Sequence, residues 1–327
     1  MADIVSIGKI LRDIIIKASD ARVVDIDAGR VISFPYKKKM NVDEVYFGAG
    51  GGAANSAISF AKLEKKASVL ACIGNDPEGD EILNLLRMRF VDTDLIQKVN
   101  DKTGVSVILT SGNLSEKDHT ILIYRGANKK ITQIEVDMDK LNEASGWYIS
   151  SVGSSDLNFL NNLIEKKSDN IKVAFNPGIL QIKKGLDNLD IILQKTDILI
   201  LNAKEAEELS SATGGKIFEV LKNAGPKLVI VTEGKSGAKV FDGTNMYYGK
   251  AFDVEAVEAL GAGDAFGSTF FALWLDSQDI EKALKYALVN SAAALEKYGA
   301  SEGLLSVEEI EKRLSEKPDF EIIKKSL

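Results

Sequence analysis

The sequence contains one cysteine and one histidine among its 327 residues, and these two scarcities exclude several classes of protein. A single thiol cannot form an internal disulfide or a cysteine-rich zinc site. Most histidine-based metal sites are excluded as well, and a Ser–His–Asp triad would depend on His119 alone. We expect Cys72 to lie in the core, His119 to lie on the surface or in a lid, and any acid–base chemistry to use carboxylates.

Long hydrophobic runs are also missing, since no apolar segment approaches the roughly 20 residues of a membrane-spanning helix. The first 20 residues have an acid at the third position and charges within their apolar part, so they do not resemble a secretory signal. Acidic residues outnumber basic ones by 48 to 41, which gives a net charge of -7 and disfavours a dedicated nucleic-acid-binding role. These absences predict a cytoplasmic protein that binds neither membranes nor nucleic acids.

Short apolar segments rich in β-branched residues alternate with amphipathic segments along most of the chain. Strands are expected at Ile4–Ile7, Ser68–Cys72, Trp147–Ile149, Lys172–Phe175, Ile198–Leu201, Leu228–Val231 and Ala238–Phe241. Helices are expected at Ala53–Leu63, Gly79–Arg87, Asp156–Lys167, Ala203–Ser210, Lys216–Asn223, Gly263–Leu275 and Ile280–Tyr298. Because strand and helix alternate and several strands are apolar throughout, we predict an α/β fold with a mostly parallel sheet covered on both faces.

Two segments, from about 14 to 47 and from about 104 to 126, break this alternation. The first contains short alternating stretches around Asp27-Ala28-Gly29, and the second reads as a hairpin around Ser111-Gly112-Asn113. They predict a small antiparallel sheet inserted into the α/β body, which could form a lid over a site. A β-extension without a role in the site, or a dimer interface, is an equal alternative.

A first glycine cluster spans Gly48 to Asn55, between an expected strand and an expected helix. Glycines there allow a ligand to approach the backbone and leave the N–H groups of the helix N-terminus free. The cluster imitates a dinucleotide fingerprint, but it does not lie in the first βα unit, where that motif belongs. A purely structural glycine turn is the alternative.

A second cluster, Gly261-Ala262-Gly263-Asp264, opens a strongly helical segment. Its N–H groups would point out of the positive end of the helix dipole and form a site for an anion. Asp264 would then be a carboxylate beside bound anionic groups, which raise its pKa toward that of a useful general base. The alternative is that Asp264 only stabilises the first turn of the helix.

Two weaker motifs follow strands. Thr232 to Gly237 contains Gly-Lys-Ser, but a Walker A loop would need glycine at position 229, which is valine, so that interpretation fails. Asn202-Ala203-Lys204-Glu205 is either a capping box at a helix N-terminus or a pair that holds a hydrated metal ion.

Taken in order, these motifs resemble those of the PfkB (ribokinase-like) family of sugar and nucleoside kinases, from Val5 to about Gly303. Gly261-Ala262-Gly263-Asp264-Ala265-Phe266 matches the C-terminal signature of the family, and Gly51-Gly52-Ala53-Ala54-Asn55 resembles its N-terminal signature. Weaker similarities lie at Gly74–Gly79, Thr103-Gly104 and Gly126-Ala127-Asn128. The resemblance implies a single ribokinase-like domain over residues 1–327, with a three-layer α/β/α body and a β-sheet lid.

The resemblance also implies an activity, the ATP-dependent phosphorylation of a hydroxymethyl group on a sugar, sugar acid or nucleoside, with Mg²⁺. Asp264 would accept the hydroxyl proton, and the N–H groups of Gly261, Ala262 and Gly263 would stabilise the transferring phosphoryl group. Other roles follow from the family in the same way. The acceptor would contact Asp13, Gly51, Gly52, Asn55 and Asn128. The nucleotide would contact Asn202, Thr232, Gly234, Gly237 and Asn290. Water-bound Mg²⁺ would be organised by Asn202 and Glu205.

The chain departs from the family pattern at three places. Glu258-Ala259-Leu260 replaces the usual Asp-Thr-Thr, Asn176-Pro177-Gly178 lacks the arginine often found near the phosphates, and Gly52 stands where ribokinases usually carry lysine. The substrate, the choice between ATP and ADP as donor, and a homodimer through the lid stay open. A catalytically inactive sugar or nucleotide sensor, and an oxidoreductase that uses a nicotinamide at Gly48–Ala53, are the alternative functions.

Overall fold

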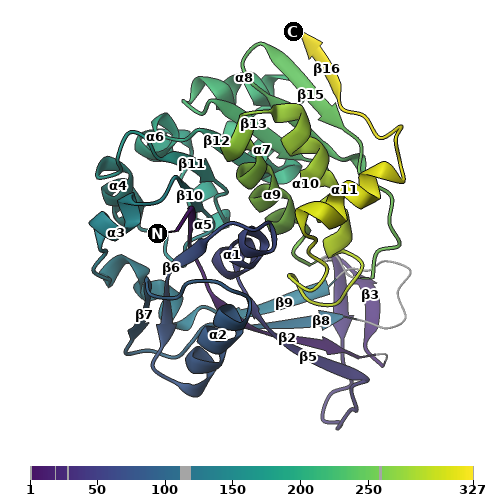
Figure 1. Ribbon diagram of the computed structural model, residues 1–327. Helices are drawn as coiled ribbons and strands as arrows, with labels where there is room; N and C mark the ends of the chain where they lie inside the picture. The colour runs from purple at the N-terminus through teal and green to yellow at the C-terminus, as the bar shows by residue number, and fades with distance from the viewer. Residues whose placement is uncertain (1, 19, 28, 111–118, 258–259, 327) are drawn as a thin grey trace.

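The computed structural model describes residues 2–18, 20–27, 29–110, 119–257 and 260–326, and its described residues form a large central sheet with helices on both faces (Figure 1). Ten strands make this sheet, in the order β16-β15-β14-β13-β12-β11-β10-β1-β6-β7. Their bounds are β1 (Ile4–Ile7), β6 (Ala67–Gly74), β7 (Ile96–Val99), β10 (Gly146–Ile149), β11 (Lys172–Phe175), β12 (Ile198–Asn202), β13 (Leu228–Thr232), β14 (Ala238–Phe241), β15 (Asn245–Gly249) and β16 (Ile323–Ser326).

The sheet is parallel from β7 to β13 and antiparallel from β13 to β16. Its central strands β1, β6 and β10 are buried along their whole length because successive side chains enter two separate cores. In β6, Val69 and Ala71 pack into one core, whereas Leu70 and Cys72 pack into the other. Burial on both faces is the expected environment for a parallel strand between two helical layers.

Each helical layer encloses one of these cores. The first layer consists of α1 (Gly52–Lys62), α2 (Pro77–Met88), α9 (Ala262–Ser277), α10 (Ile280–Ala294) and α11 (Val307–Ser315). The second consists of the 3₁₀ helix η1 (Gly126–Gln133), α3 (Met138–Asn142), α4 (Asn158–Glu165), α5 (Ile179–Ile182), α6 (Leu186–Gln194), α7 (Ala203–Ser210) and α8 (Lys216–Asn223). A short 3₁₀ turn, η2 (Gly234–Ser236), connects β13 to β14.

A second sheet of four strands projects from the lower right of the body in Figure 1, and we call it the lid. Its order is β5 (Glu44–Gly50), β2 (Leu11–Lys17), β8 (Val105–Thr110) and β9 (His119–Tyr124). A separate hairpin, β3 (Arg22–Ile26) and β4 (Gly29–Ser33), lies in the same part of the chain. The outer pairs of the lid are antiparallel, and its central pair, β2 with β8, is parallel.

The predicted fold class is confirmed, and most of the expected elements are found within two residues of their expected ends. Helix α10 ends at Ala294, four residues before the expected Tyr298. Strand β2 was not expected, because Arg12 and Asp13 interrupt its apolar residues. The turn expected at Ser111-Gly112-Asn113 lies outside the described residues. None of the described helices is long and apolar enough to cross a membrane.

Candidate active site

The residues singled out in the sequence gather at one edge of the central sheet. Strands β1, β10, β11, β12 and β13 are parallel, so their carboxyl ends share that edge. The segments that follow β1, β10, β11 and β13 contain Lys9, Ser150, Asn176 and Gly234, and β12 itself ends at the capping residue Asn202. In open α/β sheets, ligands bind outside the carboxyl ends of the strands. The candidate site is therefore expected at this edge of the sheet.

Two motifs far apart in the sequence meet here. Asn55, in the first turn of α1, donates a hydrogen bond from Nδ2 to Oδ2 of Asp264 at 2.8 Å, although 209 residues separate them. Asp264 is in the first turn of α9 and is partly exposed, whereas Asn55 is buried. The Oδ1 atom of Asn55 is buried and has no hydrogen-bonding partner among the described residues. An acceptor left without a donor next to a carboxylate is suited to a ligand hydroxyl.

The electrostatic environment gives Asp264 the properties of a base. Its surroundings remove water and raise the pKa of the carboxyl above its ordinary value, while the Asn55 hydrogen bond and the charge of Lys9 act in the opposite direction. The net pKa is raised. The carboxylate in turn contributes to a raised pKa at the Tyr148 hydroxyl, for which burial is the larger cause. A carboxylate with a raised pKa takes up a proton more readily than an ordinary one.

Glycines are required by the backbone on both sides of this pair. Gly51 has a φ of 86°, and a Cβ there would come within 2.5 Å of the Lys9 carbonyl oxygen. Gly261, the N-cap of α9, has a φ of 79°, and a Cβ there would come within 2.4 Å of the Ala300 carbonyl oxygen. Both positions therefore need glycine for two reasons: the positive φ, and the close approach of a second segment.

The next glycine at the N-terminus of α9, Gly263, has more open surroundings than Gly261. Gly263 is exposed, and a Cβ built on it would meet no atom within 4 Å apart from its chain neighbours and the backbone of its own helix. The N–H groups of the first turn have no hydrogen-bonding partner within an α-helix, and the helix dipole gives this end a partial positive charge. The open space at Gly263 is therefore accessible to an anion.

A cavity of about 540 Å³ lies between the lid and the segment from Glu296 to Glu302. Asp13, on β2, lines it, and its carboxylate packs against Gly50, where a Cβ would come within 1.9 Å of Oδ2. Ala300, which packs against Gly261, lines the same cavity. The ring of Tyr46, on β5, stacks on that of Tyr298 at a centroid distance of 5.1 Å. The cavity is large enough for a small molecule and adjoins the mouth of α9.

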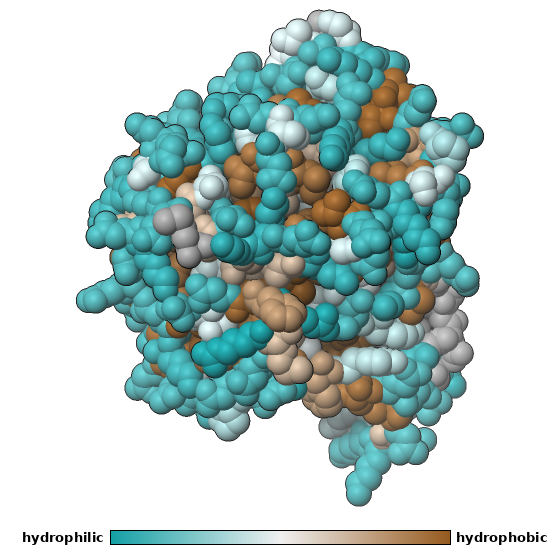
Figure 2. Space-filling view, viewed as in Figure 1, coloured by the Kyte–Doolittle hydropathy of each residue, from teal (hydrophilic) through white to brown (hydrophobic). Residues whose placement is uncertain are grey.

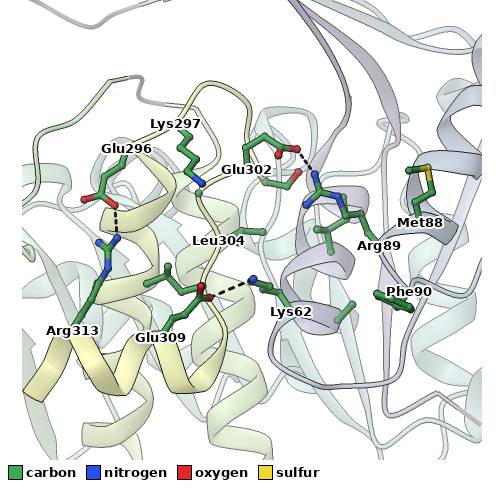
Figure 3. Close-up of a pocket in the computed structure, with 15 residues that line it drawn as sticks. Lys62, Met88, Arg89, Phe90, Glu296, Lys297, Glu302, Leu304, Glu309 and Arg313 are labelled. Carbon is green, nitrogen blue, oxygen red and sulfur yellow. Dashed lines mark hydrogen bonds and ion pairs between the residues drawn. The ribbon is translucent and has the colours of Figure 1, made fainter.

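A neighbouring cavity of about 570 Å³ lies between α1, α2, α11 and the same 296–305 segment (Figure 3). Most of its charged side chains are already paired, Arg313 with Glu296 at 2.6 Å and Arg89 with Glu302 at 2.5 Å. None of the sequence-predicted site residues lines it. The cavity that Asp13 lines is therefore the better candidate for substrate.

Two of the predicted asparagines are held by protein groups. Asn128 accepts from the Ile10 backbone N–H at 2.9 Å and donates to the carbonyls of Ile10 and Arg125 at 2.7 and 3.0 Å. Asn290 donates to the Thr269 hydroxyl and accepts from the Leu305 N–H, both at 2.8 Å. In this arrangement their amides fix the segments around the site, and Asn128 fixes the segment that leads to Asp13.

Asn202 and Glu205 form the capping box that is one of their two predicted interpretations. The Asn202 side chain accepts from the Glu205 N–H, and Glu205 Oε2 accepts from the Asn202 N–H, both at 2.9 Å. Burial raises the pKa of Glu205, against the effect of these hydrogen bonds. The box uses one carboxylate oxygen and leaves Oε1 for a metal-bound water. Because Mg²⁺ keeps most of its water, these residues fit a hydrated ion.

No group of three or more histidine, cysteine, aspartate or glutamate side chains that could hold a metal ion is found among the described residues. An ion here would thus have few direct protein ligands.

On the neighbouring strand, Thr232 ends β13 and Gly234 starts η2 with a φ of 57° and open space around it. Gly237 has a φ of 93°, and a Cβ there would come within 2.0 Å of the Gly249 carbonyl oxygen.

Lys9 is the side chain in this region to which the sequence assigned no role. It lies four residues before Asp13, and a lysine beside apolar residues at a strand end carries no motif of its own. Burial and the charge of Arg125 lower its pKa, while Asp264 raises it, and the net pKa is lowered.

His119 and Cys72 lie as expected, in lid strand β9 and in the core.

Comparison with known proteins identifies relatives over nearly the whole chain. The profile described as "pfkB family carbohydrate kinase" matches residues 1–306. A ribokinase of Haemophilus influenzae is 26% identical, with 85% of this chain and 92% of that protein covered. An ATP-dependent ribose-1-phosphate kinase of Halopiger xanaduensis is 29% identical, with 75% and 79% covered. The structure of a putative ribokinase II from E. coli, in complex with ATP and Mg²⁺, superposes with a TM-score of 0.80 at 24% identity, covering 97% of this chain and 100% of that one.

Proposed function

Because the chain belongs to the pfkB family of carbohydrate kinases, we propose that it transfers the terminal phosphoryl group of ATP to a hydroxymethyl group of a sugar, sugar acid or nucleoside. The family defines the enzyme as a kinase and removes the nicotinamide-dependent oxidoreductase as an alternative. The putative ribokinase II of E. coli, whose fold is similar, was solved in complex with ATP and Mg²⁺. The kind of acceptor and the roles of individual residues are the parts that we propose.

The observation that carries the proposal is the hydrogen bond from Asn55 to Asp264. It joins the two glycine motifs and places a carboxylate of raised pKa at the open mouth of a helix. An alcohol seated in the cavity of Asp13 has an acceptor for its proton in Asp264. Its new phosphate ester has N–H donors in the first turn of α9. These are the two requirements of phosphoryl transfer to an alcohol: alignment with a base, and stabilisation of the transferring charge.

We assign the remaining residues as follows. Asp13, with Gly51, Gly52 and Asn55, holds the acceptor, while Thr232, Gly234 and Gly237 form the nucleotide side of the site. Glu205, oriented by Asn202, would hold Mg²⁺ through water. The ion, when bound, neutralises charge on the phosphates.

The lid offers a further assignment, a homodimer. Strand β9 exposes the side chains of Ile121, Leu122, Ile123 and Tyr124, and β5 exposes Val45 and Phe47. Figure 2 shows hydrophobic residues on the surface at the lower right, where the lid lies in Figure 1. Strands β9 and β5 are the two opposite edges of the lid sheet, and an exposed apolar edge strand tends to pair with another chain. We expect sedimentation equilibrium to give twice the monomer mass, and Leu122→Lys to return the monomer. A wild-type chain that sediments as a monomer at high concentration would rule out this interface.

The kinase proposal is tested by a phosphorylation screen. We expect ATP-dependent product with at least one acceptor among ribose, fructose, 2-keto-3-deoxygluconate, adenosine, cytidine, inosine and ribose 1-phosphate. Each acceptor is assayed with ATP and with ADP as donor, and the product is identified by mass. Binding of a sugar or nucleotide without turnover of any acceptor would instead support a sensor.

A further inference from the structure

The backbone of Lys9 is fixed against the first glycine motif and the end of β10. Its N–H donates to the Ser151 carbonyl, and its own carbonyl accepts from the Ala53 N–H, both at 3.2 Å. The carbonyl also lies so close to Gly51 that a side chain there would collide with it. The backbone of Lys9, just after β1, is therefore held in place between the N-terminus of α1 and Ser151.

The side chain of Lys9 is only partly exposed, and its charge acts on Asp264. Within the described residues the ammonium makes no side-chain hydrogen bond and no direct ion pair with Asp264. The two groups attract through space. Taking an ammonium out of water without a contacting partner is unfavourable, and such groups concentrate at functional sites.

Two positions that the family pattern associates with positive charge, residue 52 and the 176–178 segment, supply none here. Gly52 has no side chain, although a Cβ there would lie 3.4 Å from Oδ1 of Asp264. Asn176, which follows β11, donates its amide to the Ile200 carbonyl at 2.9 Å and is neutral. The transferring phosphoryl group carries spread negative charge, which a cation stabilises in a site shielded from water. The ammonium of Lys9 supplies a positive charge that acts on Asp264.

We propose that Lys9 is the cation of the phosphoryl-transfer centre, facing Asp264 in the free enzyme and the transferring group in the transition state. The inference rests on the proposed kinase function. In the reaction, Asp264 takes the proton of the acceptor hydroxyl as its oxygen forms a bond to the γ-phosphorus. The bond from that phosphorus to the bridging oxygen breaks, and its electron pair leaves on ADP. Lys9 stays protonated throughout.

A ligand-free experiment tests the electrostatic half of the proposal. Lys9 after β1 and the amide of Asn55 on α1 act on the pKa of Asp264, and Asp264 in turn acts on that of Tyr148 on β10. We expect Lys9→Met to raise the pKa of Asp264, because the attracting charge is lost, and Lys9→Arg to leave it near the wild-type value. The pKa is measured by ¹³C-carboxyl NMR, with the resonance assigned through Asp264→Asn. Lys102→Met removes a lysine that acts on Asp76 instead and serves as control. An Asp264 pKa unchanged by Lys9→Met overturns this half.

The other half is tested with MgADP alone and with MgADP plus aluminium fluoride, which mimics the transferring group. We expect Lys9→Met to weaken the aluminium fluoride complex at least 10-fold and to leave MgADP affinity unchanged, measured by calorimetry. On the acceptor found by screening, kcat should fall about 100-fold, the loss typical of one stabilising donor, and Lys9→Arg should restore most of it. A rise confined to the acceptor KM would assign Lys9 to substrate recognition and overturn the proposal. If wild type phosphorylates nothing, the kinase function fails, while the NMR and aluminium fluoride results still decide the role of Lys9.

Discussion

Replacing Asp264 by asparagine should lower kcat by a factor of about 10² to 10⁴ and leave the affinity for acceptor within a few-fold, because a positioned general base contributes that much to rate. The asparagine fills the same space beside Asn55 but cannot accept the proton. In wild type, kcat should fall as the pH is lowered through the pKa of Asp264, which lies above its ordinary value. That acidic limb should be missing from the variant. Steady-state kinetics across pH measure both effects.

A matched control is available in another helix. Asp187 is an exposed acid in the first turn of α6 and has the same relation to its helix dipole as Asp264 has to that of α9. Asp187→Asn should leave kcat unchanged. If Asp264→Asn also turned over at the wild-type rate, Asp264 would be no more than a residue that stabilises the start of its helix.

Replacing Gly263 by alanine should separate ligand binding from folding. Apart from its chain neighbours and the backbone of its own helix, no atom lies within 4 Å of the added Cβ, and the backbone there has an ordinary φ, so the protein itself does not require glycine. Stability should rise by about 0.5 kcal/mol, as for other compatible glycine-to-alanine changes. Turnover should fall about 100-fold, because the methyl group would keep the phosphoryl group from the N–H donors of the first turn. Chemical denaturation and kinetics give the two values.

Gly261→Ala is the contrasting variant. Its Cβ would lie 2.4 Å from the Ala300 carbonyl oxygen at a φ of 79°, so we expect stability to fall by about 1–3 kcal/mol together with activity. Full activity in Gly263→Ala would show that no ligand approaches this turn, and the anion site would have to lie elsewhere.

The sequence predicted the central sheet well because its strands carry the signal in their own residues. A strand such as Ile198–Leu201 is apolar throughout since two helical layers cover it, and β12 extends only one residue beyond it. Strand β2 escaped because it belongs to the lid, where only one face is well buried and Arg12 and Asp13 interrupt the pattern. Local sequence cannot show which distant strand such a segment will pair with.

The candidate site was predictable to the extent that its geometry is local. Asp264 in the first turn of its helix and the Asn202–Glu205 capping box both follow from neighbouring residues. The use of Asn128 to bind the Ile10 backbone depends on residues 118 positions away, and no pattern signals it. Lys9 was missed for the same reason, since its importance comes from Asp264 and Arg125, which only the fold brings near.

The contact between Asn55 and Asp264 has a consequence for how the protein is made. One partner emerges from the ribosome early and the other 209 residues later, and the Ala300 segment that supports Gly261 comes later still. A nascent chain therefore cannot assemble the site until nearly all of its length has been synthesised and packed. Chains that end before Ala300 should thus be unable to form the site.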